Sequence, residues 1–176
     1  MIGVHLNMVV AFPENRDNPP MDGVTQEEML DLMRMPQFLK EETGYQRIQG
    51  TKPQTLSYGL NDSPAGLAAW IVEKFHSWSD CGGEIERRFT KDQLLTNIIL
   101  YWVPQTANSS CRLYYEAQHA DMFPPAGFRC DVPTGCAIFP GEMFKPPRVW
   151  AEKMFHVQRW ARFPSGGHFA AMEGPE

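Results

Sequence analysis

Strand patterns occur only near the two ends of this 176-residue chain, and this spacing strongly limits the folds it can form. Residues 2–10 form an apolar run, typical of a strand buried on both faces. The roughly hundred residues that follow show no convincing strand pattern and are expected to be helical. Strand patterns return at 132–140 and 156–163, with a proline-started helix at 146–155 between them. The order strand, helical block, strand, helix, strand predicts an α/β fold.

Three sequence signals predict where helices of the central block begin. Residues 25–28 and 90–93 both match the capping box, in which a threonine and a Glu or Gln three residues later satisfy each other's backbone N–H groups. Residues 62–64 place a cap residue directly before a proline in the first turn. Apolar side chains then recur at helical spacing after each start, as expected for helices that bury one face.

The predicted sheet is incomplete, because two or three parallel strands cannot cover both faces and both edges of a sheet. The last residues, 169–176, leave room for a helix of no more than about two turns, shorter than a typical packed helix. We therefore expect the chain to be truncated at both ends.

The composition of the chain argues against several classes of binding partner. The net charge is -5 and no stripe of Lys and Arg occurs, which argues against nucleic acid. No apolar stretch is long enough to span a membrane. The cysteines are widely spaced, so neither a metal nor a cofactor site is expected, and both free thiols and disulfides are compatible with the pattern. They are Cys81, Cys111, Cys130 and Cys136.

His168 is the most informative single residue. It follows Gly166-Gly167 directly after a predicted strand, where a tight turn presents a side chain at the carboxyl edge of the sheet. A loop histidine alone is more often an ordinary surface residue. Glu142, however, follows the preceding predicted strand, 26 residues earlier, and adjacent parallel strands would bring the two together. Glu142 could then orient the imidazole, in the chain order of acid and histidine that α/β-hydrolases use.

Six segments in the same order carry a resemblance that covers nearly the whole chain. They are His5–Met8, Glu42–Thr55, Gly59–Phe75, Leu94–Trp102, Val132–Gly135 and Gly166–Glu173. In these segments the chain resembles the microsomal-type epoxide hydrolases, which include insect juvenile hormone epoxide hydrolases and fungal relatives. The resemblance implies an incomplete α/β-hydrolase fold, with a helical lid and the last core strands but without the N-terminal half of the core. It divides the chain into a core strand (1–14), a helical lid or cap (15–122) and a C-terminal core segment with the acid and histidine loops (123–176).

The resemblance also implies a mechanism. In the family an aspartate opens the epoxide to form an ester, two lid tyrosines hydrogen-bond the oxirane oxygen and supply its proton, and a histidine activates the water that hydrolyses the ester. By motif, Tyr45 matches one lid tyrosine and Tyr114 the other, with Tyr115 as the alternative register. His168 matches the base and Glu142 the residue that orients it.

The nucleophile elbow of the family, an aspartate in a glycine-flanked turn between a strand and a helix, does not occur in this sequence. Asp80 follows a helical pattern and is expected to be a turn residue. We therefore expect a fragment of an epoxide hydrolase, which converts small apolar epoxides and water to vicinal diols, and expect this chain to be inactive by itself. The alternative is a non-catalytic protein that binds apolar ligands or another chain through its helical lid. The sequence leaves open whether the parent protein is cytoplasmic or associated with the endoplasmic reticulum.

Overall fold

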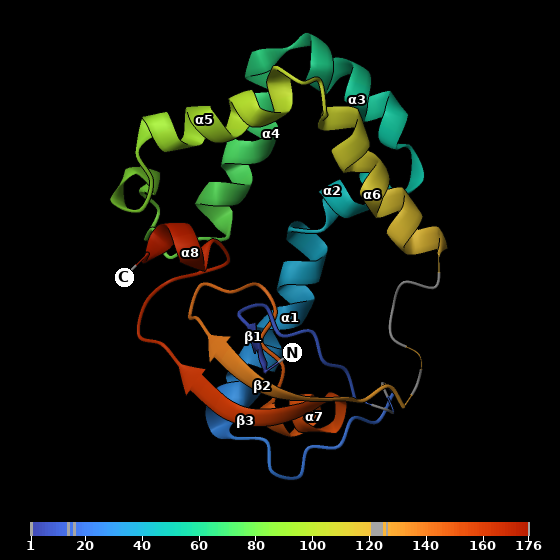
Figure 1. The fold of residues 1–176 in the computed structure, drawn as a ribbon, viewed down its shortest axis with the longest axis vertical. Helices are drawn as coiled ribbons and strands as arrows, with labels where there is room; N and C mark the ends of the chain where they lie inside the picture. The colour runs from blue at the N-terminus through green and yellow to red at the C-terminus, as the bar shows by residue number, and fades with distance from the viewer. Residues whose placement is uncertain (1, 14, 16, 121–124, 126, 176) are drawn as a thin grey trace. The chain divides into compact units, whose positions relative to one another are not determined.

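The computed structural model describes residues 2–13, 15, 17–120, 125 and 127–175. The chain forms two compact units. The sheet unit consists of Met1–Phe38 and Pro125–Glu176, and the helical unit consists of Leu39–Pro124. The chain therefore begins in the sheet unit, folds the whole helical unit, and then returns to complete the sheet unit (Figure 1).

Three parallel strands form the sheet of the sheet unit. They are β1 (Val4–Leu6), β2 (Cys130–Ile138) and β3 (Phe155–Arg162), hydrogen-bonded in the order β1-β2-β3. Helix α7 (Arg148–Met154) connects β2 to β3 and contacts β3 (Figure 1). Parallel strands need such a crossover, because the chain must return to the same end of the sheet before the next strand begins.

The core of the sheet unit lies around the carboxyl end of β2. Residues 136–138 are buried one after another, as expected for a central strand covered on both faces. Leu32 from α1 (Gln26–Glu41) and Val149 from α7 pack against the same cluster, so both helices share one core. The fully buried members of this cluster are Val9, Ala11, Cys136, Ile138, Trp150 and Ala151.

Glu28 is a buried carboxylate that caps two helices of the sheet unit. One of its oxygens accepts a hydrogen bond from the backbone N–H of Thr25 at 2.9 Å, and the Thr25 hydroxyl accepts from the Glu28 N–H at 3.2 Å. Its other oxygen accepts from the backbone N–H of Arg148, the first residue of α7, at 2.8 Å. Helix N-termini carry unpaired N–H groups and a partial positive charge, so one carboxylate stabilises both ends.

The substitution Glu28→Ala is expected to lower the free energy of unfolding by about 2–3 kcal/mol, because each lost cap costs about 1 kcal/mol and a buried N–H is left unpaired. Urea unfolding of the purified chain measures this change. Glu27→Ala is the matched control, since Glu27 is the neighbouring carboxylate on α1 but is 66% exposed and pairs with Arg162 at the surface. Its loss should cost no more than about 1 kcal/mol. Equal effects of the two substitutions would contradict the double-cap role.

Five α-helices and one 3-10 helix form the helical unit, and none of its described residues lies in a strand. α2 and α3 both contact α6, and α4 contacts α5. The core of this unit is a cluster of Leu60, Leu67, Ile98, Ala107 and Cys111. The helices are α2 (Gly44–Thr51), α3 (Pro53–Asp62), α4 (Pro64–Ser77), η1 (Ile85–Arg87), α5 (Lys91–Trp102) and α6 (Ala107–His119).

All three predicted helix starts are confirmed. α1 begins directly after Thr25, and α5 begins after Thr90 with both hydrogen bonds of the capping box present. α4 begins after Ser63, whose hydroxyl accepts from the backbone N–H of Gly66 at 3.0 Å. Local cap chemistry therefore sets these boundaries, as the sequence pattern indicates.

The strands at 132–140 and 156–163 are confirmed as β2 and β3, each shifted by one or two residues. The first strand differs from its prediction. β1 covers only Val4–Leu6, and Ile2 is 99% exposed, so residues 2–10 are not a strand buried on both faces. Among the described residues β1 pairs with β2 alone and is an edge strand, while the buried part of the segment, around Val9, lies beyond it.

The two-unit division and the division expected from sequence differ over residues 15–38. The resemblance implies that these residues belong to the helical lid, whereas contact clustering groups them with the sheet unit. The physical reason is α1, because its Glu28 caps α7 and its partly buried Leu32 packs against the sheet core.

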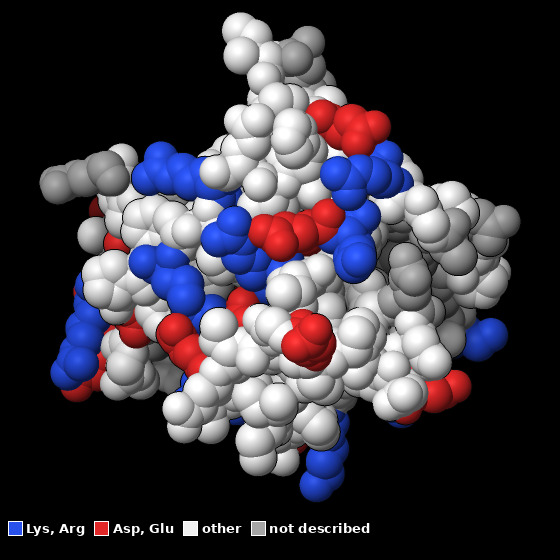
Figure 2. All heavy atoms as spheres, turned by 90° about the horizontal axis from the view of Figure 1, so that it is seen from below, with Lys and Arg blue, Asp and Glu red and all other residues white. Residues whose placement is uncertain are grey.

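The surface carries charges of both signs. On the face drawn in Figure 2, Lys and Arg side chains stand beside Asp and Glu. Exposed ion pairs of the sheet unit include Arg129 with Asp131 at 2.9 Å and Arg148 with Glu152 at 2.7 Å. Searched over the described residues, the helices include none long and apolar enough to cross a membrane. All four cysteines are free thiols.

Candidate active site

Glu142 and His168 form a hydrogen-bonded pair beyond the carboxyl ends of adjacent strands. Glu142 lies four residues after β2 ends and His168 six residues after β3 ends. Nδ1 of His168 is 2.9 Å from Oε1 of Glu142. The carboxylate is 1% exposed, whereas the imidazole is 24% exposed. The structure thus brings together the two residues whose position after neighbouring strands suggested a pair, with the acid buried and the histidine still reached by solvent.

Backbone pairing continues past the strands and fixes the two loops that carry this pair. The N–H of Gly141 donates to the carbonyl of Gly166 at 3.0 Å, and Gly141 and Gly167 form a parallel β-bridge. Phe139 and Phe163, which leave β2 and β3, stack with ring centroids 4.9 Å apart. The loops are therefore held side by side independently of the Glu142 and His168 side chains.

Gly166 has a conformation that favours glycine. Its φ is +109°, and a Cβ at this position would lie 2.8 Å from the Phe139 ring. Both the backbone angle and the close ring contact exclude a larger residue without rearrangement. The first glycine of the Gly-Gly pattern before His168 therefore has a specific physical cause.

The contacts of Glu142 determine which imidazole nitrogen carries hydrogen. An ionised carboxylate only accepts hydrogen bonds, so Nδ1 of His168 must be the donor to Oε1. The same oxygen accepts from the backbone N–H of Met143 at 2.8 Å, which holds the carboxylate in place. Oε2 of Glu142 is buried and has no hydrogen-bond partner among the described residues. A neutral His168 then has its lone pair at Nε2, where it can take a proton from water.

Tyr45 and Tyr114 form a second pair, within the helical unit. Tyr45 is in the first turn of α2 and Tyr114 is in α6, and their ring centroids are 5.6 Å apart in an edge-to-face arrangement. The side-chain amide of Gln46 donates to the Tyr45 hydroxyl oxygen at 2.9 Å. Two neighbouring phenols can donate hydrogen bonds to the same oxygen atom of a ligand.

Tyr115, the alternative to Tyr114, has a different environment. It is exposed and stacks on the imidazole of His119, with ring centroids 4.0 Å apart. Neighbouring residues of a helix point in different directions, so only one of the two consecutive tyrosines can face Tyr45. That residue is Tyr114.

Burial is the main cause that raises the pKa of Tyr114 from 10.0 to about 12, and charge repulsion and a hydrogen bond from the neighbouring Tyr45 contribute to the same shift. The neutral phenol is therefore the form that the folded helical unit favours. Because the folded-state pKa lies above the usual one, the stabilisation that Tyr114 contributes is present below about pH 10 and is lost as the pH rises towards 12.

An alkaline titration of the chain, followed by the ultraviolet absorbance of phenolate, is expected to show one tyrosine that ionises last, near pH 12. Tyr114→Phe should remove this last step, and Tyr45→Phe should move it to lower pH because Tyr45 helps to raise the pKa of Tyr114. If Tyr114→Phe instead removes a phenolate that forms near pH 10, the environment described for Tyr114 is wrong.

Three residues around Tyr45 were assigned no role from the sequence. Trp78 packs against Tyr45 with ring centroids 5.3 Å apart, and the Lys74 ammonium lies over both rings, 5.2 Å and 5.1 Å from their centroids. Glu42 accepts from the Trp78 indole N–H at 3.0 Å and lies 3.6 Å from the Lys74 ammonium. The four-residue spacing of Lys74 and Trp78 was the available signal, because it places both on one side of a helical turn.

Asp80 lies in a bend between α4 and η1 and is held by Arg88. The guanidinium bonds the Asp80 carboxylate at 2.9 Å and its backbone carbonyl at 2.8 Å. A carboxylate held in this way has a structural partner, which supports the interpretation as a turn residue. Among the described residues, no group of three or more His, Cys, Asp or Glu side chains is placed so that it could hold a metal ion.

Comparison with known proteins gives consistent similarities. No protein-family model matches the chain. Epoxide hydrolase 1 of Sus scrofa is 42% identical over 147 residues, covering 78% of this chain and 32% of that protein. Epoxide hydrolase 1 of Oryctolagus cuniculus is 36% identical over 195 residues, covering 99% of this chain and 43% of that protein. The crystal structure of juvenile hormone epoxide hydrolase from the silkworm Bombyx mori superposes with a TM-score of 0.87 at 33% identity, covering 100% of this chain and 46% of that one. The chain thus spans less than half the length of these relatives.

Proposed function

Because the chain belongs to the epoxide hydrolase family and has part of an α/β-hydrolase fold, we propose that it supplies the base and the oxygen-binding tyrosines for hydrolysis of epoxides to vicinal diols. The observation that carries this proposal is the 2.9 Å hydrogen bond between Glu142 and His168. A buried acid that fixes the tautomer of a partly exposed histidine is the arrangement that activates water.

The proposed role of His168 is in hydrolysis of an ester intermediate. Nε2 takes a proton from water as the water oxygen bonds to the ester carbonyl carbon. The bond between the carbonyl carbon and the ester oxygen then breaks, and the imidazolium returns its proton to the leaving alkoxide, which releases the diol. The proton of the carboxylic acid formed in this step restores the tyrosine that was deprotonated in ring opening and leaves the carboxylate. Glu142 stabilises the imidazolium formed in the first of these steps, because its carboxylate lies within hydrogen-bond distance of Nδ1.

The proposed role of Tyr45 and Tyr114 is in ring opening. An epoxide oxygen is a poor leaving group until donors stabilise its developing negative charge. The two phenols lie in edge-to-face contact, and burial keeps Tyr114 neutral and able to donate. One of them then gives its proton to the oxygen as the carbon–oxygen bond breaks.

Ring opening also needs a nucleophile, and the 176 residues contain no aspartate in a Gly-x-Asp-x-Gly elbow. We therefore propose that the chain by itself forms no diol. Small apolar epoxides such as styrene oxide are the substrate class expected from the family.

The experiment compares the chain alone with a chimera. In the chimera, the chain replaces the matching segment of the silkworm enzyme, whose structure covers all of it. The chain alone is expected to give no diol from styrene oxide, whereas the chimera is expected to give diol. Turnover by the chain alone that His168→Ala abolishes would refute the proposed inactivity. A folded chimera without turnover would refute the proposed roles of this chain.

A second candidate is a non-catalytic protein that binds apolar ligands or another chain through its helical unit. The observation that favours it is a row of exposed apolar side chains on and just after α5, at a spacing of four residues. Leu95, Ile99 and Val103 are 53%, 52% and 72% exposed. Binding of an apolar fluorescent probe to the folded chain, lost when all three are changed to serine, would support this candidate if the chimera gives no diol.

A further inference from the structure

We propose that Lys145 and Asp31 are positioning residues that hold the loop of Glu142 in register with His168. The inference rests on the proposed function, in which the Glu142 and His168 pair is the water-activating base. Lys145 and Asp31 bind each other, the backbone of Pro140 and the Arg162 side chain, so the proposed action runs through the backbone of the acid loop, defined as residues 139–147.

Lys145 closes the acid loop on itself. Its ammonium donates to the carbonyl of Pro140 at 2.8 Å, five residues back along the chain, and Glu142 lies within the loop that this bond closes. Lys145 is only 8% exposed, which is unusual for a lysine and requires compensation by buried acceptors. On the other side of Lys145, Pro146 and Pro147 are fully buried and have fixed φ angles. The segment that carries Glu142 is therefore fixed at both of its ends.

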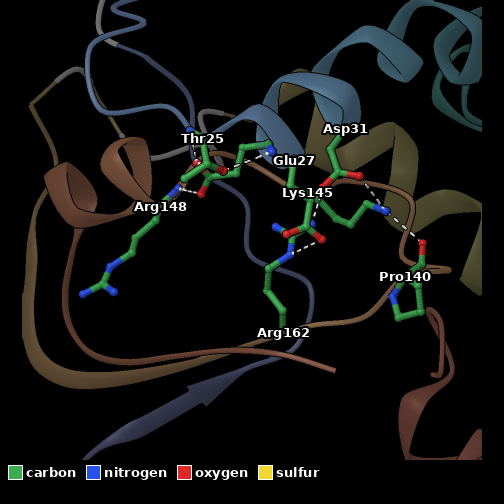
Figure 3. A network of polar contacts seen from close by, with 8 residues as sticks. Thr25, Glu27, Asp31, Pro140, Lys145, Arg148 and Arg162 are labelled. Carbon is green, nitrogen blue, oxygen red and sulfur yellow. Dashed lines mark hydrogen bonds and ion pairs between the residues drawn. The ribbon is translucent and has the colours of Figure 1, made fainter. Parts of the chain in front are cut away.

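Asp31 joins the acid loop to the end of β3. One of its oxygens lies 3.0 Å from the Lys145 ammonium, and the other lies 2.6 Å from the Arg162 guanidinium (Figure 3). Arg162 is the last residue of β3, and His168 follows it by six residues. One carboxylate on α1 thus binds both the loop that carries the acid and the strand that leads to the histidine.

The cost of burial explains why such a cluster acts on geometry more than on stability. The Asp31 and Lys145 side chains are 7% and 9% exposed, so both charges have lost most of their hydration. Buried ion pairs are often no more stabilising than apolar residues of similar volume, but they accept only a narrow range of geometries. Movement of Pro140 would take one of two acceptors from the buried Lys145 ammonium, and movement of Arg162 would take one of two cations from the buried Asp31 carboxylate. This penalty holds the two loop origins in place.

The experiment observes the hydrogen bond between His168 and Glu142 directly. Proton NMR of the ¹⁵N-labelled chain follows the signal of the imidazole Nδ1–H. This signal is assigned to His168 because it is absent from the spectrum of His168→Gln. Lys145→Met keeps the apolar stem and removes the charge, and is expected to abolish the signal or to speed its exchange with solvent at least about tenfold. Lys145→Arg retains a cationic donor and is expected to restore most of the protection.

The matched control is Glu28→Gln. Glu28 is also a buried carboxylate of α1, about one turn from Asp31, and it caps α7 without contacting Lys145 or Pro140. Glu28→Gln should destabilise the chain but leave the Nδ1–H signal in place. If lost stability alone were the cause, the signal would weaken in Glu28→Gln as it does in Lys145→Met.

An unchanged signal in a folded Lys145→Met variant would overturn the proposal. If circular dichroism shows that Lys145→Met is unfolded, Asp31→Asn is tested instead, because it keeps the side-chain volume and removes one charge. Faster exchange at the imidazole in this variant supports the proposal, and unchanged exchange overturns it. None of these measurements requires turnover, so they test the positioning role separately from the proposed function. A chimera that forms diol without His168 would refute the proposed function but would not change the NMR result.

Discussion

His168→Gln in the chimera is expected to stop the reaction at the ester. Glutamine fills similar space but has no lone pair basic enough to take a proton from water, so ester hydrolysis should slow by about 10²–10⁴-fold. Ring opening does not use His168 in the proposed mechanism and should continue at its original rate. Rapid mixing of excess enzyme with epoxide, followed by mass spectrometry of the quenched protein, would then detect the accumulated ester.

The matched control for this substitution is His156→Gln. His156 lies on β3 in the same unit and is exposed, and its Nδ1 is 3.2 Å from the carbonyl of Asp131, outside the proposed site. Diol formation should be unchanged in this variant. If His168→Gln forms diol at the unsubstituted rate, or lacks diol without accumulating ester, the histidine does not act as the base of ester hydrolysis.

Replacing both Tyr45 and Tyr114 by phenylalanine is expected to block the step before the ester. Each lost donor to a developing oxyanion costs about 10²–10³-fold, and the two losses are not expected to multiply fully because the phenols act on the same atom. Single-turnover measurements should therefore show slow loss of epoxide and no accumulation of ester, the reverse of the His168→Gln pattern. Comparing the ring-opening rates of the two single variants with the rate of the double variant measures how far the effects of the two phenols depend on each other.

Tyr115→Phe is the matched control, because it removes a phenol from the adjacent position of α6. Tyr115 stacks on His119 and is exposed, so its hydroxyl should not affect ring opening. A slow ring opening in Tyr115→Phe together with an unaffected Tyr114→Phe would reverse the assignment of the two tyrosines.

The sequence predicts most accurately those parts of the fold that are decided locally. Helix starts at Thr25, Ser63 and Thr90 follow from a side chain and a backbone N–H within three residues, and all three are present in the structure. β1 is less predictable, because whether an apolar segment is buried depends on neighbours far away in sequence. Val9 is buried and Ile2 is exposed although both belong to one apolar run.

The candidate site shows the same limit. Glu142 and His168 follow adjacent strands, so topology alone places them near each other. The contact of Tyr114 with Tyr45 depends on how α6 rotates against α2, which motif spacing does not determine. The link from Asp31 to Lys145 spans 114 residues and joins a helix to a loop, and no local pattern predicts such a contact.

The route of the chain through its two units has a consequence for variation in this family. Residues 39–124 form the helical unit as one continuous segment, while the sheet unit is assembled from the segments before and after it. The pairing of β2 with β3 and the bridge between Gly141 and Gly167 lie wholly in the segment after this insertion, so we expect both to persist when the length of the insertion changes. The proposed water-activating pair is thus encoded separately from the two tyrosines proposed to bind the epoxide oxygen, so substitutions in the helical unit can change the proposed tyrosine site while the pair in the sheet unit is retained.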